Sequence, residues 1–169
     1  MISPDHVRLF ARYNRWQNES LYGAADTLTD AERKADRGAF FGSIHGTLSH
    51  LAFGDQIWMY RFTGDDAFRP IAGSIAESVT AVQDWVRLKA VRTDLDERII
   101  GWADRVTPEH LAGDLVWFSG AANKELTRPR WVLVTHMFNH QTHHRGQVHC
   151  LLTQYGRKPA ATDIPFMPS

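Results

Sequence analysis

Twelve consecutive residues decide how the rest of the sequence is interpreted: His136-Met-Phe-Asn-His140-Gln-Thr-His143-His144-Arg-Gly-Gln147. They lie in a segment with the apolar periodicity of a long helix. His140 and His144 are four residues apart, so they project from one face of a helix, and His136 lies a turn earlier on that face. Two imidazoles are able to share a metal ion, but a divalent ion generally needs a third protein ligand. The run therefore predicts a metal site that another segment completes.

Helix capping residues divide the chain into long helices. Ser3, Ser43 and Ser74 each stand where an N-cap is expected, and apolar residues follow each of them at helical spacing. Helices are predicted from residue 4 to about 28, from 44 to about 63, from 75 for about thirty residues, and from 130 to 155, with a short helical turn after Thr29. Residues 115–118 are apolar and β-prone, and turn residues follow them. We therefore expect one all-α domain over residues 1–169, a four-helix bundle with a small hairpin or extended flap before the last helix.

The composition limits the classes of partner. The 19 Lys and Arg residues balance 19 Asp and Glu residues, so no basic excess favours nucleic acid or an anionic membrane. No apolar run is long enough to cross a bilayer. Cys150 is the single cysteine, which excludes an internal disulfide and a thiolate-rich zinc site, and we expect it in the core. Without a signal peptide, a cytoplasmic protein with neither nucleic acid nor a membrane as partner is expected.

His50, in the second predicted helix, is the best candidate for the third ligand. It occurs early in an amphipathic helix that must pack on the others. Gly54 follows one turn later on the same face, and its missing side chain suggests space beside an ion for water or substrate. One histidine from one helix and a pair from another is a familiar way to build a metal site in a bundle.

Six further residues are candidates to line the cavity beside the ligands or to support them: Asn14, Asn18, Asp55, Trp58, His136 and Arg145. The two asparagines interrupt an apolar face, and their alternative role is to bond the backbone or neighbouring helices. Arg145 is expected to pair with Asp55, with an anionic substrate as the alternative. His136 either supports the site or packs, and each proposed ligand has an alternative role as a hydrogen-bonded core imidazole.

Three segments resemble one protein family: Arg12-Tyr-Asn-Arg-Trp-Gln-Asn18, Thr47-Leu-Ser-His-Leu51 with Asp55 and Trp58, and Asn139-His-Gln-Thr-His-His-Arg-Gly-Gln147. They look like the DinB family of bacterial damage-inducible proteins, which is distinct from the DNA polymerase of the same name, and the similarity covers nearly the whole chain. The resemblance implies a DinB/YfiT-like bundle, a homodimer, and a divalent metal held by three histidines that fall on His50, His140 and His144. Relatives include thiol-dependent transferases and a mycothiol-dependent isomerase.

Three functions stay open at this point. The leading hypothesis is a metal-dependent transferase that activates a low-molecular-weight thiol, because three imidazoles leave a position open on the ion. The alternatives are a metal-dependent hydrolase or isomerase of a small molecule and a noncatalytic metal-binding dimer. Gln141 stands where zinc proteases carry the glutamate of His-Glu-x-x-His, which counts against a peptidase. Nitrogen ligands suit zinc or nickel, with iron or copper as further candidates, and the catalytic residues beyond the ligands are unknown.

Overall fold

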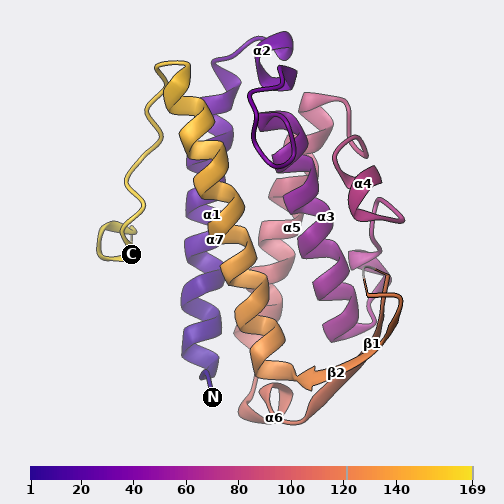
Figure 1. Ribbon diagram of the computed structural model, residues 1–169. Helices are drawn as coiled ribbons and strands as arrows, with labels where there is room; N and C mark the ends of the chain where they lie inside the picture. The colour runs from indigo at the N-terminus through magenta and orange to yellow at the C-terminus, as the bar shows by residue number, and fades with distance from the viewer. Residues whose placement is uncertain (121, 169) are drawn as a thin grey trace.

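Four long helices lie side by side in the computed structural model, which describes residues 1–120 and 122–168 (Figure 1). They are α1 (Pro4–Asp26), α3 (Ile44–Thr63), α5 (Trp85–Arg105) and α7 (Arg130–Gln154). α1 packs against α5 and α7, and α3 packs against the same two helices. Apolar side chains from all four helices form one buried core. The predicted all-α four-helix bundle is confirmed.

The predicted capping residues set the helix ends. The side chain of Ser3 accepts a hydrogen bond from the backbone of His6, and Ser43 caps α3 in the same way. The short helix α2 (Asp30–Lys34) carries the predicted capping box at Thr29. α3 ends at Gly64, whose φ of 69° lies in the left-handed region that favours glycine.

The single helix predicted after Ser74 is two helices, so that prediction was wrong. α4 (Ile75–Ser78) ends after one turn, and α5 starts afresh with Asp84 as its N-cap. The backbone carbonyl of Ser78 accepts a hydrogen bond from the Ser49 side chain, and the carbonyl of Val82 accepts one from His45. A continuous helix would have engaged both carbonyls in its own ladder, so their bonds to α3 replace the missing helical bonds.

The predicted hairpin consists of β1 (Asp114–Ser119) and β2 (Lys124–Pro129), paired antiparallel with Trp117 opposite Leu126. It follows a short helix that was not predicted, α6 (Pro108–Leu111), and leads directly into α7. Figure 1 shows the hairpin running up beside the C-terminal end of α3. The ring of Trp117 lies 5.6 Å from that of Trp58, so the hairpin contacts the C-terminal half of α3.

The tail after α7 turns back along α1 (Figure 1). The Tyr13 hydroxyl donates to the carbonyl of Thr162 at 2.7 Å, and Gln17 donates to the carbonyl of Ala161 at 2.9 Å. Two short 3₁₀ helices complete the described elements, η1 (Asp66–Phe68) and η2 (Ile164–Phe166). No helix among the described residues combines the length and apolarity that crossing a membrane requires.

Cys150 lies on the exposed side of α7, so its predicted place in the core was wrong. Val148, Leu151 and Leu152 are the residues of this turn that pack on the other helices. Cys150 is two positions beyond Val148, and two residues along a helix correspond to about 200° of rotation. The side chain therefore points away from the core.

A chain of buried charged and polar groups crosses the bundle between α3, α5 and α1. Arg92 donates to the Asp55 carboxylate at 2.7 Å and lies 3.0 Å from the Asp96 carboxylate. Asn18 donates to Asp96 at 2.9 Å, and all four side chains are buried. Because buried charges are tolerated only when paired, this network constrains how the three helices pack.

Replacing Arg92 with methionine is expected to lower the free energy of unfolding by about 3–5 kcal/mol, because the two carboxylates would stay buried without their cation. Urea denaturation monitored by circular dichroism measures the loss. Arg98→Met is the matched control on the same helix, since it removes only an exposed pair with Asp94 and should cost less than about 1 kcal/mol. Equal losses for the two variants would contradict a structural role of the buried network.

Candidate metal centre

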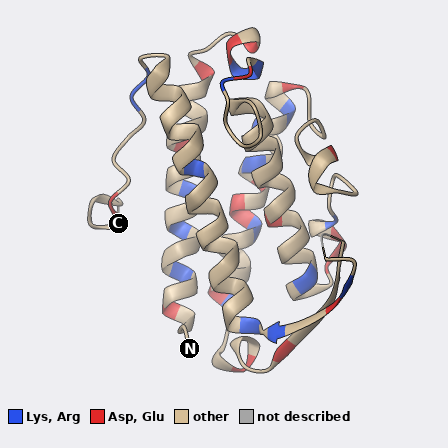
Figure 2. Ribbon diagram, in the orientation of Figure 1, with Lys and Arg blue, Asp and Glu red and all other residues tan. Residues whose placement is uncertain are grey.

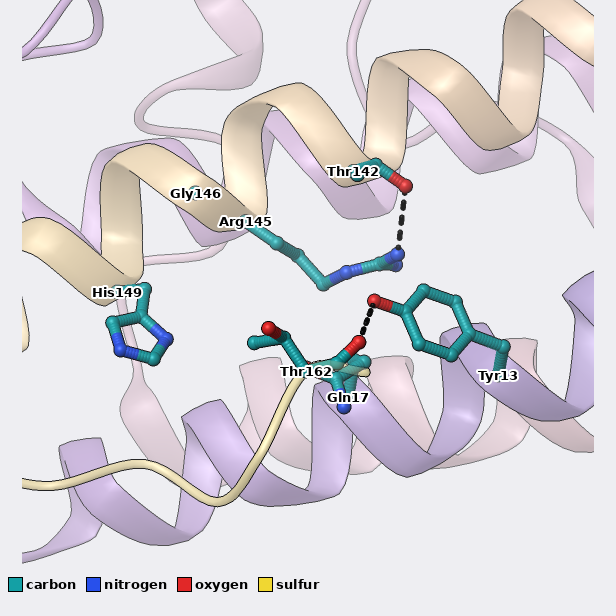
Figure 3. Close-up of a pocket in the computed structure, with 7 residues that line it drawn as sticks. All are labelled: Tyr13, Gln17, Thr142, Arg145, Gly146, His149 and Thr162. Atoms are coloured by element: carbon teal, nitrogen blue, oxygen red, sulfur yellow. Dashed lines mark hydrogen bonds between the residues drawn. The ribbon is translucent and has the colours of Figure 1, made fainter. Parts of the chain in front are cut away.

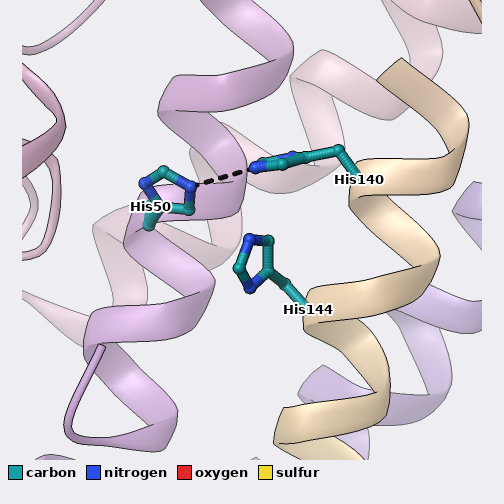
Figure 4. A group of neighbouring side chains, drawn as sticks. All are labelled: His50, His140 and His144. Carbon is teal, nitrogen blue, oxygen red and sulfur yellow. Dashed lines mark hydrogen bonds between the residues drawn. The ribbon is translucent and has the colours of Figure 1, made fainter. Parts of the chain in front are cut away.

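α3 and α7 bring His50, His140 and His144 together, with their rings converging from the two helices (Figure 4). One ring nitrogen from each lies within 4.8 Å of the other two, which is close enough for all three to hold one metal ion. The Nε2 atoms of His50 and His140 are 3.2 Å apart, and the ring centroids of His140 and His144 are 4.5 Å apart. The structure thus gathers the three histidines that the sequence singled out.

Hydrogen bonds fix the tautomers of two of these rings. The Ser78 hydroxyl donates its proton to the carbonyl of Ile75, so it must accept a hydrogen bond from Nδ1–H of His50, 2.9 Å away. The side-chain oxygen of Gln147 accepts a bond from Nδ1–H of His144 at 2.8 Å. Nε2 of each ring is then unprotonated and carries the lone pair that binds an ion, which is the usual arrangement around histidine ligands. The hydrogen bond between Nε2 of His50 and Nε2 of His140 (Figure 4) would give way to the ion.

All three imidazoles are neutral at physiological pH. Burial, together with repulsion from neighbouring imidazoles, lowers the pKa of His140 to about 3 and that of His50 to about 4. The pKa of His144 is also lowered, again mainly by burial. Neutral imidazole is the form whose lone pair coordinates a metal, so protons compete weakly for these nitrogens. The donor set therefore fits a divalent ion.

Phe41 and Gly54 shape the immediate surroundings. The Phe41 ring stacks on His50 at a centroid distance of 3.8 Å and lies 5.1 Å from His144. A Cβ atom at Gly54 would lie 3.1 Å from Cε1 of His140. Gly54 also lines the cavity beside the histidines, so the space that the sequence suggested there for water or substrate is present. A side chain at this position would press on the His140 ring, so glycine lets α7 bring that ring close to α3.

A cavity of about 830 Å³ opens beside the histidines, between α3, α4, the hairpin and α7. His50, His136 and His140 line it at one side, and rings of α3 and the hairpin, including Trp58 and Trp117, form its walls. Trp58 and His136 therefore line the cavity, with their rings 5.1 Å apart. Partial burial, followed by repulsion from Arg61, lowers the pKa of His136. No Asp or Glu is among the described residues that line the cavity.

The other polar candidates, Asn14, Asn18, Asp55 and Arg145, are not among the described residues that line this cavity. The predicted ion pair of Arg145 with Asp55 was wrong, because Arg92 occupies that carboxylate. Arg145 instead donates to Asn14 at 2.6 Å and to Thr142 at 3.3 Å. It lines a second cavity, of about 360 Å³, where its guanidinium lies between α7 and α1 (Figure 3). Asn18 bonds Asp96, as described above.

Gln141 sets the rotation of α7 about its axis. Its side-chain amide donates to the Leu51 carbonyl at 3.2 Å and also to the Asp55 carboxylate. Gln141 is fully buried and immediately follows His140, so anchoring it on α3 turns His140 and His144 toward His50.

Arg130 and Arg145 are the only charged residues of α7, whose ribbon is otherwise uncharged in Figure 2.

Ser78, Gln147 and Phe41 contact the proposed ligands but were not identified from the sequence. Gln147 lies three residues after His144, a helical spacing that would have indicated a contact. Ser78 and Phe41 come from other segments, and no local pattern predicts that those segments pack against His50.

Two comparisons with known proteins match most of this chain. A family model described as the DinB family matches residues 3–169. The protein DinB of Bacillus subtilis (strain 168) is 25% identical over 154 residues, which cover 89% of this chain and 87% of the relative.

Replacing His144 with alanine should weaken zinc binding by about a hundredfold or more, because two imidazoles rarely hold a divalent ion. The affinity is measured by competition with a chromogenic chelator, and circular dichroism checks that helicity is kept. His143→Ala is the matched control, because His143 immediately precedes His144 on α7 and its side chain is exposed. Indistinguishable affinities of the two variants would mean that His144 does not bind the ion.

Gly54→Ala should weaken zinc binding by about tenfold or more, because the added methyl group pushes the His140 ring away from its position. Alanine is the better helix former, so a loss of helical structure is not expected. Gly146→Ala is the control within α7, since a Cβ there meets nothing within 4 Å. Equal zinc affinities of the two glycine variants and the wild type would show that the contact at Gly54 does not position His140.

Proposed function

Because the chain belongs to the DinB family and gathers His50, His140 and His144 beside an open cavity, we propose that it is a metal-dependent thiol transferase. In this proposal the three histidines hold a divalent ion, zinc or nickel by preference. A low-molecular-weight thiol attacks an electrophilic small molecule in the adjacent cavity. The observation that carries the proposal is the large cavity that adjoins two of the three imidazoles.

An ion bound by three neutral imidazoles keeps its full charge, leaves a position open and lowers the pKa of a thiol or a water molecule that binds there. The protein's own contribution is to keep the three rings neutral and to fix two of them through Ser78 and Gln147. These hydrogen bonds orient the rings before any ligand arrives.

The walls of the cavity favour thiol transfer over hydrolysis. A thiol has a pKa of about 8.5, whereas bulk water has one of about 15.7. The pKa of water must therefore be lowered much further than that of a thiol before it loses its proton at neutral pH. None of the described lining residues is a carboxylate that would act as a general base. Gln141, at the position of the zinc-protease glutamate, is turned to α3 and bonded there. Rings such as Trp58 and Trp117 provide an apolar surface for an organic electrophile.

His136 supports a second candidate function, that of a metal-dependent isomerase or hydrolase. It lines the same cavity one turn from His140, and its lowered pKa keeps it neutral. A neutral imidazole is able to accept a proton from a substrate or from water. In the transferase, His136 has no such role, so the two candidates differ in whether His136→Gln reduces turnover at saturating substrate.

The family resemblance also implies a homodimer, which we propose as the assembled form. Light scattering at micromolar concentration is expected to give about twice the monomer mass of 19.2 kDa. A monomeric mass would contradict this part of the proposal.

Transfer is tested with 1-chloro-2,4-dinitrobenzene as the electrophile and cysteine, glutathione or mycothiol as the thiol. The thiol releases its proton to water, the sulfur forms a bond to the ring carbon, and chloride leaves with the electron pair of the broken carbon–chlorine bond. Conversion above the uncatalysed rate should require both a thiol and zinc or nickel, and it should fall about a hundredfold or more in His144→Ala. His143→Ala should keep wild-type activity.

Equal conversion of the electrophile without thiol would contradict transfer and favour the hydrolase. No conversion by metal-loaded protein with any of the three thiols would favour a noncatalytic metal-binding protein.

A further inference from the structure

Arg61 projects into the same cavity as the histidines, from the last turn of α3. It is partly buried, and no carboxylate among the described residues lies within 4.0 Å of it. Its neighbours are aromatic rings, with the guanidinium carbon 4.7 Å from the Trp58 ring and 5.8 Å from that of Trp117. Arg61 is therefore a cation that the rings hold in place and that has no acidic partner.

The electrostatic surroundings of Arg61 differ from those of Arg92 and Arg69. Burial lowers its pKa, and no nearby acid acts in the opposite direction. By contrast, Arg92 lies between two buried carboxylates, and Arg69 pairs with Asp66 at 2.6 Å. An arginine stays charged at neutral pH, so Arg61 keeps a partly desolvated charge without compensation. An anion that enters the cavity would supply the missing charge.

The cavity as a whole is suited to an anion. Its described lining residues include Arg61, three histidines and no acid, so the fixed charge is positive. Low-dielectric walls strengthen the attraction between such a charge and an incoming anion. Arginine also presents several donors in a planar arrangement that matches a carboxylate, sulfonate or phosphate group.

The distance along α3 indicates where the anion would lie. Arg61 is eleven residues after His50, which corresponds to a rise of roughly 16 Å along a helix. Trp58 lies between the two positions, and Trp117 and Phe118 of the hairpin cover the same part of the cavity. His50 and Arg61 thus lie toward opposite ends of a space with aromatic walls, and His136 lies nearer the arginine, beside Trp58.

We propose that Arg61 binds an anionic group of the substrate, so that this site takes small molecules with an apolar, preferably aromatic, body and an anionic end. The inference rests on the proposed function in that it takes the cavity beside the histidines as the substrate site. Arg61 is a specificity-determining residue in this account and takes no part in the reaction itself.

A purely structural role for Arg61 makes a different prediction. Its charge lies near the C-terminal end of α3, where a cation interacts favourably with the helix dipole, and it stacks on Trp58. Both effects contribute to stability without any ligand. Loss of the charge would then alter the melting temperature without changing the selectivity between anionic and neutral compounds.

The test compares two compounds of similar shape, naphthalene-2-sulfonate and the uncharged 2-naphthylmethanol, by isothermal titration calorimetry. A sulfonate is a weak metal ligand, so its preference over the alcohol reports mainly on the arginine. Wild-type protein should bind the sulfonate about tenfold more tightly than the alcohol. Arg61→Met, which keeps the apolar stem, should lose that preference while binding the alcohol within about twofold of wild type. Arg69→Met, an arginine stacked on Tyr60 but ion-paired outside the cavity, should retain the preference.

A sulfonate preference that persists in Arg61→Met, equal binding of the two compounds by wild type, or no binding of either would each overturn the inference. The titrations are made on both zinc-loaded and chelator-treated protein, and thiol transfer is assayed on the same preparations. Arginine-dependent sulfonate binding would support the inference even if thiol transfer were absent. Conversely, thiol transfer without sulfonate selectivity would leave the proposed function standing and remove this inference alone.

Discussion

The carboxylate of Asp55 is the anchor on which the rest of the structure depends. It binds Arg92 of α5 and Gln141 of α7, so one buried group on α3 fixes two neighbouring helices. α7 needs such an anchor, because polar residues such as Gln141 and Arg145 occur on its buried side and apolar burial alone does not specify its rotation. Buried hydrogen bonds are costly to leave unmade, and they therefore select one rotation of the helix. That rotation is the one that directs His140 and His144 at His50.

Two sets of buried polar groups in the protein differ in physical character. The set around Asp55 and Arg92 pairs opposite charges across the bundle and holds the helices together. The three histidines form the other set, which is uncharged because burial lowers their pKa values. A site without its own charge, beside a cavity with no Asp or Glu among its described lining residues, is suited to acquiring positive charge from a metal ion. It is also suited to attracting an anionic ligand afterwards.

Local patterns were sufficient to predict α1, α3 and α7 and the shared helix face of His140 and His144. N-caps such as Ser43 and the left-handed Gly64 mark helix ends because each satisfies backbone groups locally. The spacing of His140 and His144 on one helix face is equally local. The break between α4 and α5 could not be predicted, because its cause is the bonding of Ser78 and Val82 to another helix. The partner of Asp55 was missed for the same reason, since choosing Arg92 over Arg145 depends on how three helices meet.

Anomalous diffraction from crystals grown with zinc tests the central claim most directly, because it locates the ion relative to each side chain. Our account predicts a zinc peak at about 2.0–2.1 Å from one nitrogen of each of His50, His140 and His144, with His136 and His143 outside bonding distance. The remaining coordination position should face the cavity that Arg61 lines. A zinc peak held by other residues, or no peak at the three histidines in crystals that contain zinc elsewhere, would contradict the account.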